Sequence, residues 1–218
     1  MKYKAVLFDL DGTLLDTIED LSDSMNAALA ELGSPSRTVA ECKRFVGDGV
    51  RAFAERSLPQ DRRDEKTVSQ CIALARRHYA SNWANKTQPY EGIPELLDAL
   101  TQRGLKLAVL SNKPDDTTQL CVGKLLSNWR FEVVQGVCDG VEPKPDPSGA
   151  IGVAATLGVA PEQFLYVGDT NTDMLTANAA GMHAVGVLWG FRTAEELTNH
   201  GAAMLLGSPC DLIELLEQ

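Results

Sequence analysis

The sequence predicts an α/β fold in which helices alternate with the strands of a parallel sheet, interrupted near its start by an all-helical insertion. Short apolar runs of strand length alternate with helical patterns from about residue 89 onward. Between Thr17 and Asn85, in contrast, apolar residues recur only at helical spacing. Alternating strands and helices form parallel sheets with right-handed crossovers. With 218 residues, the chain can bury a full core, either as one domain or as a core with an insert.

The first expected strand begins at Ala5 and ends at Asp9. Its apolar run is too short for a helix or a membrane span and is typical of a fully buried strand. Asp9 and Asp11 follow at a spacing of two, and Gly12-Thr13 then indicates that the chain leaves the strand. Two carboxylates beside a buried strand repel each other, so they need a cation or a shared proton. The alternative is a plain strand-end turn, because Asp and Gly are favoured there.

The helical insertion is expected to contain four helical segments separated by short turns. Gly33 is placed to end the first of them, and Gly47-Asp48-Gly49 separates the second from the third. The expected segments are 17–32, 39–45, 50–58 and 61–84.

The remainder of the chain predicts the rest of the sheet and its covering helices. Strands are expected at 106–110, 131–134, 164–167, 184–187 and 203–206, and helices at 92–103, 117–126, in the segment ending at 157, in the segment ending near 181, and at 211–216. We therefore predict a core domain formed by residues 1–15 and 87–218 and a helical domain formed by residues 16–86.

Composition narrows the class of partner. The formal net charge of −10 argues against a nucleic acid or a membrane surface, and no apolar stretch approaches the length of a membrane span. The five cysteines are scattered without metal-ligand or redox spacing, which predicts reduced thiols in a cytoplasmic protein. Patterning leaves a monomer and a homodimer equally open.

Four groups of polar residues follow in order along the predicted core, each at a strand end or in the loop beside one. Each has an ordinary explanation alone: Ser111-Asn112 as a turn or helix cap, Lys144 as a solvated lysine between prolines, and Asp173 as a helix N-terminal charge. Ligands of open α/β sheets bind at the carboxyl ends of the strands, so together the groups predict one site. The groups are Asp9 with Asp11, Ser111 with Asn112, Lys144, and Gly168-Asp169-Thr170-Asn171-Thr172-Asp173.

This ordered set resembles the haloacid dehalogenase superfamily of hydrolases, of the phosphatase type. The resemblance covers nearly the whole chain and implies a Rossmann-like core, with residues 16–86 in the position of that family's helical cap. Within the superfamily, Phe45–Val50 and the segment Gly186–Phe191 are most similar to phosphoglycolate phosphatases.

The resemblance implies a covalent mechanism. Asp9 would be the nucleophile that forms an aspartyl-phosphate, and Asp11 would protonate the leaving alkoxide and then take a proton from water. Mg²⁺ would bind the Asp9 carboxylate, the Asp11 backbone carbonyl and Asp169. The metal would lower the repulsion between the carboxylate and the phosphate dianion.

The remaining motif residues are expected to hold the phosphate or to position the metal. Lys144 would place a fixed positive charge beside the nucleophile, while Ser111, Asn112 and Thr13 would contact the substrate. Asp173 would orient the metal-bound waters or Lys144.

The helical block would act as a lid that excludes water and selects the substrate. Its glycines Gly47 and Gly49 allow a close backbone approach to the substrate, although a plain interhelical turn is the alternative. Three positions depart from the family pattern without touching the chemical step: Thr170 stands for Ser, Asn171 for a basic residue and Glu91 for Pro.

The predicted function is a Mg²⁺-dependent phosphatase for a small phosphorylated metabolite, with 2-phosphoglycolate as the first candidate. A nucleotide, a sugar phosphate or pyrophosphate would use the same machinery. Nothing in the sequence demands a mutase, and Asp11 argues against a dehalogenase, which needs no second acid. A catalytically silent binding protein is the remaining alternative, but it would have no need to keep all four of Asp9, Asp11, Lys144 and Asp169.

Overall fold

The computed structural model describes residues 2–216 and divides into two compact units. One unit, here called the α/β unit, comprises Met1–Leu15 and Pro89–Gln218. The other, the helical unit, comprises Asp16–Gln88. The chain thus enters the α/β unit, leaves it after its first strand, and returns to complete it.

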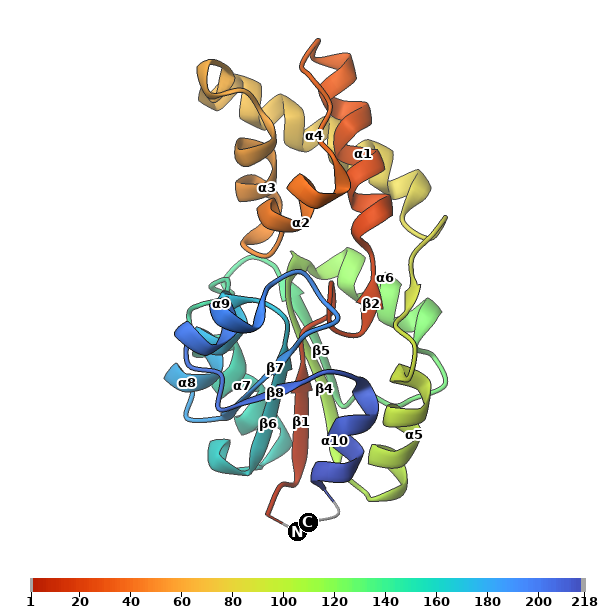
Figure 1. The fold of residues 1–218 in the computed structure, drawn as a ribbon, viewed down its shortest axis with the longest axis vertical. Helices are drawn as coiled ribbons and strands as arrows, with labels where there is room; N and C mark the ends of the chain where they lie inside the picture. The colour runs from red at the N-terminus through yellow and green to blue at the C-terminus, as the bar shows by residue number, and fades with distance from the viewer. Residues whose placement is uncertain (1, 217–218) are drawn as a thin grey trace. The chain divides into compact units, whose positions relative to one another are not determined.

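The α/β unit is built on a six-stranded sheet in the order β5-β4-β1-β6-β7-β8, with parallel pairing at every neighbouring pair of strands (Figure 1). This confirms the predicted α/β fold class. The strands are β1 (Ala5–Phe8), β4 (Lys106–Pro114), β5 (Val133–Val137), β6 (Phe164–Gly168), β7 (His183–Val187) and β8 (Met204–Leu206).

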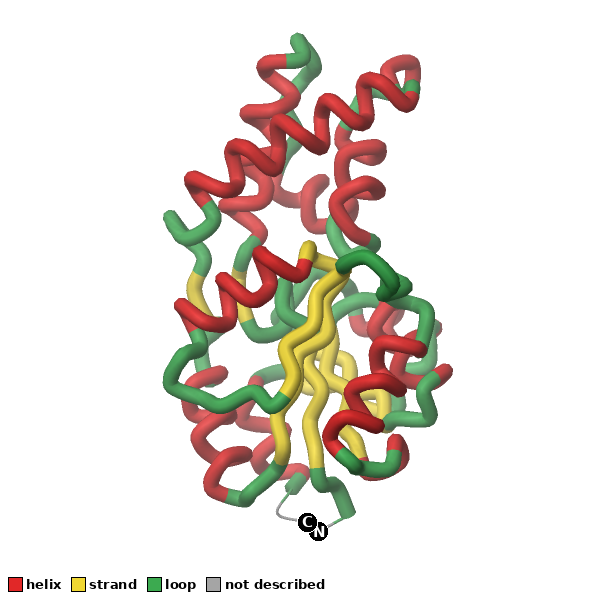
Figure 2. The backbone as a smooth tube through the Cα atoms, turned by 180° about the vertical axis from the view of Figure 1, so that it is seen from behind, coloured by secondary structure: helices red, strands yellow, loops and turns green. Residues whose placement is uncertain are grey.

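Helices cover both faces of this sheet, as Figure 2 shows from behind. On one face, Leu7, Ala108 and Tyr166 form a buried cluster with residues of α7, α8 and α9. The central strand β1 is buried along its whole length, as expected for a strand covered on both sides. The helices of this unit are α5 (Ile93–Gln102), α6 (Asp115–Leu125), α7 (Ser148–Leu157), α8 (Asn171–Ala179), α9 (Ala194–Asn199) and α10 (Pro209–Leu215), with a 3-10 turn at Pro161–Gln163.

The helical unit consists of α1 (Ile18–Glu31), α2 (Val39–Phe45), α3 (Gly49–Ser57) and α4 (Glu65–Asn82), with a 3-10 turn at Gln60–Arg62. Helix α1 packs along α4, where the buried Met25 and Cys71 sulfur atoms lie 3.7 Å apart. The buried carboxylate of Asp20 accepts hydrogen bonds from the backbone of Lys86 and from the backbone and hydroxyl of Thr87. Asp20 thereby fixes the end of this unit to the start of α1.

The two passages between the units pair with each other. β2 (Leu15–Asp16) and β3 (Gln88–Pro89) form a two-stranded sheet, and the Tyr90 backbone N–H donates to the Leu14 carbonyl beside it. These two-residue strands have no sequence pattern of their own and were not predicted.

The sheet differs from the sequence prediction mainly at β4 and β5. β4 does not end at Leu110 but continues to Pro114, and its register against β5 shifts between those residues. Leu110 pairs with Gln135 and Pro114 with Val137, so an interval of four residues in β4 corresponds to an interval of two in β5. The expected strand at 131–134 was therefore placed too early, because pairing with β4 and not the apolar run determines the bounds of β5.

Two further findings concern expectations from composition. Among residues 2–216, no helix combines the length and the apolar character that crossing a membrane requires. All five cysteines are free thiols: Cys42, Cys71 and Cys121 are buried, and Cys138 and Cys210 are exposed. The cytoplasmic location and the oligomeric state stay predictions.

Candidate active site

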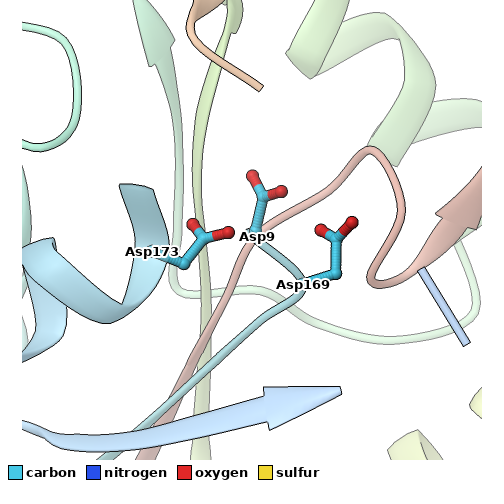
Figure 3. Close-up of side chains that lie close together, drawn as sticks. All are labelled: Asp9, Asp169 and Asp173. Atoms are coloured by element: carbon cyan, nitrogen blue, oxygen red, sulfur yellow. The ribbon is translucent and has the colours of Figure 1, made fainter. Parts of the chain in front are cut away.

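Three aspartates meet at the carboxyl ends of the central strands. Asp9 directly follows β1, Asp169 directly follows β6, and Asp173 lies in the first turn of α8. One carboxylate oxygen from each lies within 4.8 Å of the others, and in Figure 3 Asp9 stands between the other two. Since β1 and β6 are adjacent parallel strands, their ends present these side chains at the same edge of the sheet.

Burial and mutual repulsion make the metal-free carboxylates hard to ionise. Burial raises the pKa of Asp9 to about 7, and the nearby charges of Asp173 and Asp11 add to the effect, although Lys144 opposes it. Burial, reinforced by the charges of Asp9 and Asp173, also raises the pKa of Asp169 well above its usual range. A cation at this edge would relieve both penalties.

Lys144 lies between two of the aspartates. Its Nζ is 2.7 Å from Asp9 Oδ1 and 2.7 Å from Asp173 Oδ1, and it also donates to the Leu110 carbonyl at 3.1 Å. Burial disfavours the charged ammonium, but the charges of Asp173 and Asp9 outweigh burial and raise the pKa of Lys144 well above its usual value. Lys144 is therefore a fixed positive charge beside Asp9.

The loop that carries Lys144 is fixed by Asn112. The Asn112 side chain donates to the Lys144 carbonyl at 3.0 Å and accepts from the Lys144 backbone N–H at 2.8 Å. This pair of bonds joins the end of β4 to a loop rich in proline, which has few backbone donors of its own. Asn112 thus positions Lys144 through the backbone.

Asp173 is held by donors on both of its oxygens. Oδ1 accepts from Lys144 and, at 3.3 Å, from the Tyr166 hydroxyl, while Oδ2 accepts from the backbone N–H and the hydroxyl of Thr170. The bonds with Thr170 form a capping box at the start of α8. Asp173 therefore has both of the roles that the sequence left open: it caps a helix, and it orients Lys144.

Asp169 is held in place by the turn after β1 and by the loop after β7. Its Oδ1 accepts from the Thr13 hydroxyl at 3.1 Å, and its Oδ2 accepts from the Phe191 backbone N–H at 2.8 Å. The Trp189 indole N–H in turn donates to the Thr13 carbonyl at 2.9 Å. Loop 188–191 and the turn after β1 together hold the Asp169 carboxylate.

Two glycines allow this close approach. A Cβ on Gly190 would lie within 2.5 Å of both Asp169 Oδ2 and the Gly12 carbonyl oxygen. Gly12 itself has a φ of +93° and also faces the Asp169 carboxylate. Both positions therefore require a residue without a side chain.

Asp11 pairs with a lysine that sequence reasoning did not single out. Lys113 Nζ lies 3.0 Å from Asp11 Oδ1 and 3.1 Å from Asp11 Oδ2. Lys113 follows Ser111 and Asn112 in the irregular part of β4, and its backbone N–H donates to the Ser111 hydroxyl.

The structure brings most of the predicted site residues together within the α/β unit. Asp9, Lys144 and Asp173 are in direct contact, and the other members are Asp11, Thr13, Ser111, Asn112 and Asp169. Thr13 is completely buried and donates to Asp169, so in this structure its hydroxyl contacts a carboxylate. Gly47 and Gly49 belong to the helical unit, and their role in substrate selection stays a prediction.

Sequence reasoning missed Lys113, the backbone N–H of Phe191, and Tyr166. The contacts of Lys113 with Asp11 and of Phe191 with Asp169 join segments far apart in the chain, whereas Tyr166 contacts the nearby Asp173. Only the position of Lys113 directly after Ser111-Asn112 offered a local signal.

The charges at this edge fit a divalent cation. When Asp9, Asp11, Asp169 and Asp173 are ionised, Lys113 and Lys144 compensate only two of the four negative charges. Carboxylate oxygens are the ligands that hard cations such as Mg²⁺ and Ca²⁺ prefer. Asp173 is bonded to the Lys144 ammonium and to the cap of α8, whereas Asp169 accepts from the neutral Thr13 hydroxyl and Phe191 N–H, so Asp169 is better placed than Asp173 to ligate a metal beside Asp9.

Comparison with known proteins agrees with this arrangement of fold and site. The model of the haloacid dehalogenase-like hydrolase family matches residues 6–187, a span that includes Asp9, Asp11, Lys144, Asp169 and Asp173. The chain belongs to this family and is a hydrolase.

Several relatives that align over most of the chain indicate a more specific group within this family. The phosphoglycolate phosphatase of Aquifex aeolicus is 33% identical over 214 residues, which are 98% of this chain and 97% of that protein. The phosphoglycolate phosphatase of Rhodospirillum rubrum is 37% identical over 206 residues, covering 91% of this chain and 85% of the relative. The solved structure of a candidate phosphoglycolate phosphatase from Lactobacillus delbrueckii subsp. bulgaricus matches with a TM-score of 0.93 at 32% identity and covers 99% of each chain. The chain is thus similar to phosphoglycolate phosphatases.

Proposed function

We propose that the chain is a Mg²⁺-dependent phosphatase that hydrolyses a small phosphomonoester through an aspartyl-phosphate on Asp9. The observation that carries this proposal is the placement of Lys144 between Asp9 and Asp173, beside the carboxylate of Asp169. A nucleophilic carboxylate next to a buried cation and a metal-ligating carboxylate suits attack on a phosphate dianion.

In the first step, an oxygen of the Asp9 carboxylate attacks phosphorus while the bond from phosphorus to the substrate oxygen breaks. Asp11, in its protonated form, gives its proton to the leaving alkoxide, which departs as an alcohol. The Asp11 side chain is 14% exposed, so it is accessible to solvent water. Transfer by such a positioned acid contributes about 10²- to 10⁴-fold to a rate.

In the second step, water attacks phosphorus and the bond to Asp9 breaks. Asp11, now a carboxylate, accepts the proton of that water, so phosphate leaves and both aspartates return to their starting forms. The Lys144 ammonium stays beside the Asp9 oxygen that gains and loses the phosphoryl group.

The remaining groups hold the phosphoryl oxygens or the cation. The Ser111 hydroxyl and the Asn112 backbone N–H lie in the irregular part of β4 and are our candidates for the phosphoryl oxygens. Mg²⁺ would be held by the Asp9 and Asp169 carboxylates and the Asp11 carbonyl, and it would neutralise charge between nucleophile and phosphate. Thr13 and Phe191 orient Asp169 for this role.

The helical unit is our candidate for the lid and the substrate selector. Gly47 lies in the loop between α2 and α3, and Gly49 is the first residue of α3; their φ values are +126° and +87°. Positive φ angles suit a loop whose backbone must approach a ligand closely. This assignment rests on the resemblance to the family's cap loop.

The first-choice substrate is 2-phosphoglycolate, because full-length relatives are named for it. A nucleotide, a sugar phosphate or pyrophosphate would engage the same carboxylates and is the second choice. A silent binding protein is disfavoured because Asp9, Asp11, Lys144 and Asp169 are all present.

Phosphate release from a panel of phosphomonoesters and pyrophosphate tests the proposal, with Mg²⁺ and with a chelator. We expect turnover only with metal and a preference for 2-phosphoglycolate, and Asp9→Asn serves as the inactive control. Metal-dependent turnover with a different preferred substrate would replace the substrate and keep the mechanism. Turnover in the chelator, or in Asp9→Asn, would contradict the mechanism.

A further inference from the structure

The ion pair between Lys113 and Asp11 joins two segments of the α/β unit that are 102 residues apart. Lys113 Nζ approaches both oxygens of the Asp11 carboxylate almost equally, at 3.0 and 3.1 Å. The side chain of Lys113 is 4% exposed and that of Asp11 is 14% exposed. Charge-assisted bonds in such a buried place are stronger and more directional than those at a surface.

The backbone of Lys113 is fixed as firmly as its side chain. Its N–H donates to the Ser111 hydroxyl at 3.2 Å, and its carbonyl accepts from the Thr118 hydroxyl at 3.3 Å. Gly136 of β5 packs against that carbonyl so closely that a Cβ there would overlap it. The ammonium group is therefore presented from a rigid base.

Lys113 lies within the register shift of β4. The shift falls between Leu110 and Pro114, and such irregularities bend a strand and re-aim its side chains. Within the shifted segment, Asn112 bonds to the Lys144 loop and Lys113 bonds to Asp11. This one irregular segment thus positions both Lys144, which lies beside Asp9, and Asp11.

The Lys113 end of the pair is shielded from water. Cys121 of α6 is completely buried, and burial raises the pKa of its thiol to about 11, with Lys113 and Asp11 close enough to affect it in opposite directions. In such an environment, loss of the ammonium leaves the Asp11 carboxylate without a partner to fix its orientation.

We propose that Lys113 is a positioning residue that holds the Asp11 carboxylate in the place from which it exchanges protons with the leaving group and with water. The inference rests on the proposed function, in which Asp11 is the acid and base. Lys113 then acts on the reaction only through Asp11.

The dependence of kcat/KM on the leaving group distinguishes this positioning role from a purely structural one. Phenyl phosphate and p-nitrophenyl phosphate have similar shapes, but p-nitrophenolate is a stable anion that leaves without help from an acid. We expect Lys113→Met to lower kcat/KM for phenyl phosphate and 2-phosphoglycolate about 10- to 100-fold, part of the usual gain from acid catalysis. For p-nitrophenyl phosphate, we expect kcat/KM to fall less than about 5-fold, because acid catalysis is the contribution that is lost.

The same comparison in an Asp11→Asn background tests whether Lys113 acts through Asp11. There Lys113→Met should cause no further loss, whereas Lys113→Arg, which keeps the charge, should retain more phenyl phosphate activity than Lys113→Met. Lys124→Met, which removes an exposed lysine of α6, is the matched control and should behave as the unsubstituted protein does.

The outcomes distinguish the inference from the proposed function. Equal losses with phenyl and p-nitrophenyl phosphate, or an additive loss in the Asp11→Asn background, would overturn the positioning role. A rise in KM confined to 2-phosphoglycolate would also overturn it and would assign Lys113 to the substrate carboxylate. If Asp11→Asn itself spares phenyl phosphate, the proposed acid–base role of Asp11 fails instead.

If Lys113→Met does not fold, the Lys113→Arg protein carries the test alone. It must then show a larger loss with phenyl phosphate than with p-nitrophenyl phosphate, and equal losses would overturn the proposal.

Discussion

Ion pairs of the helical unit and those at the active-site edge of the α/β unit differ in burial. In the helical unit, Arg51 pairs with Glu65 and Arg77 with Glu31, through side chains that are mostly 40–70% exposed. In the α/β unit, Lys144 pairs with Asp9 and Asp173 through side chains that are 7% exposed or less. Exposed pairs contribute little to folding because water and salt screen them.

The buried pairs cannot be explained by stability. Transferring an ion pair into the interior costs several kcal/mol per ion, in order of magnitude, and well-packed apolar groups often stabilise a fold as well or better. The α/β unit nevertheless concentrates four carboxylates and two lysines at one edge of its sheet. The comparison teaches that the ion pairs of the helical unit lie near its surface, whereas the α/β unit also contains buried ion pairs, at the edge of the sheet where chemistry needs them.

The largest effect is expected when Lys144, the cation of the buried ion pairs, is removed. Lys144→Met leaves Asp9 and Asp173 without their shared cation, so we expect the free energy of unfolding to fall by about 3–5 kcal/mol. We also expect kcat to fall about 10²- to 10³-fold, as when a preorganised donor is removed. Urea unfolding and phosphate release measure the two effects, and a variant with normal stability and normal kcat would contradict the account.

A smaller but sharper effect is expected from the loop that holds Asp169. In Gly190→Ala, the new methyl group would displace the Asp169 carboxylate, so we expect Mg²⁺ affinity to fall about 10- to 100-fold. Gly152→Ala in α7 is the matched control, since nothing lies within 4 Å of its Cβ position. Calorimetric titration with Mg²⁺ measures both, and equal affinities in the two variants would count against the role of loop 188–191.

The pKa of Asp9 predicts how metal binding depends on pH. Because burial raises this pKa from 3.8 to about 7, the folded metal-free protein holds a proton that the unfolded chain has lost across that window. The contribution of Asp9 to stability therefore falls as pH rises from about 4 to 7. A cation needs the ionised carboxylate, so we expect the Mg²⁺-induced rise in Tm to increase from pH 5.5 to pH 8.

Asp9→Asn is the control for this pH dependence, because it removes the titrating group. Its Mg²⁺-induced rise in Tm should be smaller and should depend less on pH. A rise in Tm that is the same at both pH values in the unsubstituted protein would show that Asp9 does not couple to the metal.

The smallest effect is expected for the exposed pair of the helical unit. Arg51→Ala removes contacts with Glu65 and Glu55 whose side chains are largely in solvent, so Tm and kcat should both stay close to those of the unsubstituted protein. A loss of stability comparable to that of Lys144→Met would erase the contrast between the two units.

The sequence predicts the parts of this molecule that rest on local patterns. Strand-length apolar runs ending in Asp9 and Asp169 locate both the sheet and its functional edge, because parallel strands end on the same side. Helical periodicity likewise predicts α1 to α4 as a helical block, although α9 is too short to show a period.

Features that depend on tertiary contact were not predictable. The ion pair of Lys113 with Asp11 forms from the shifted segment of β4, and no alternation of apolar residues reveals that shift. The bond to Asp169 from Phe191 uses a backbone N–H, so the identity of the side chain carries no signal. Asp173 was ambiguous for a different reason, because the same residue type suits a helix cap and a partner for lysine.

The step that defines the proposed mechanism is phosphorylation of the Asp9 carboxylate during turnover. The most direct test quenches the protein with acid within a single turnover of 2-phosphoglycolate and Mg²⁺, reduces the product with borohydride, and maps peptides by mass spectrometry. Reduction of an aspartyl-phosphate gives homoserine, so the account predicts homoserine at position 9 and at no other aspartate. Homoserine at another position, or turnover without any homoserine, would contradict it.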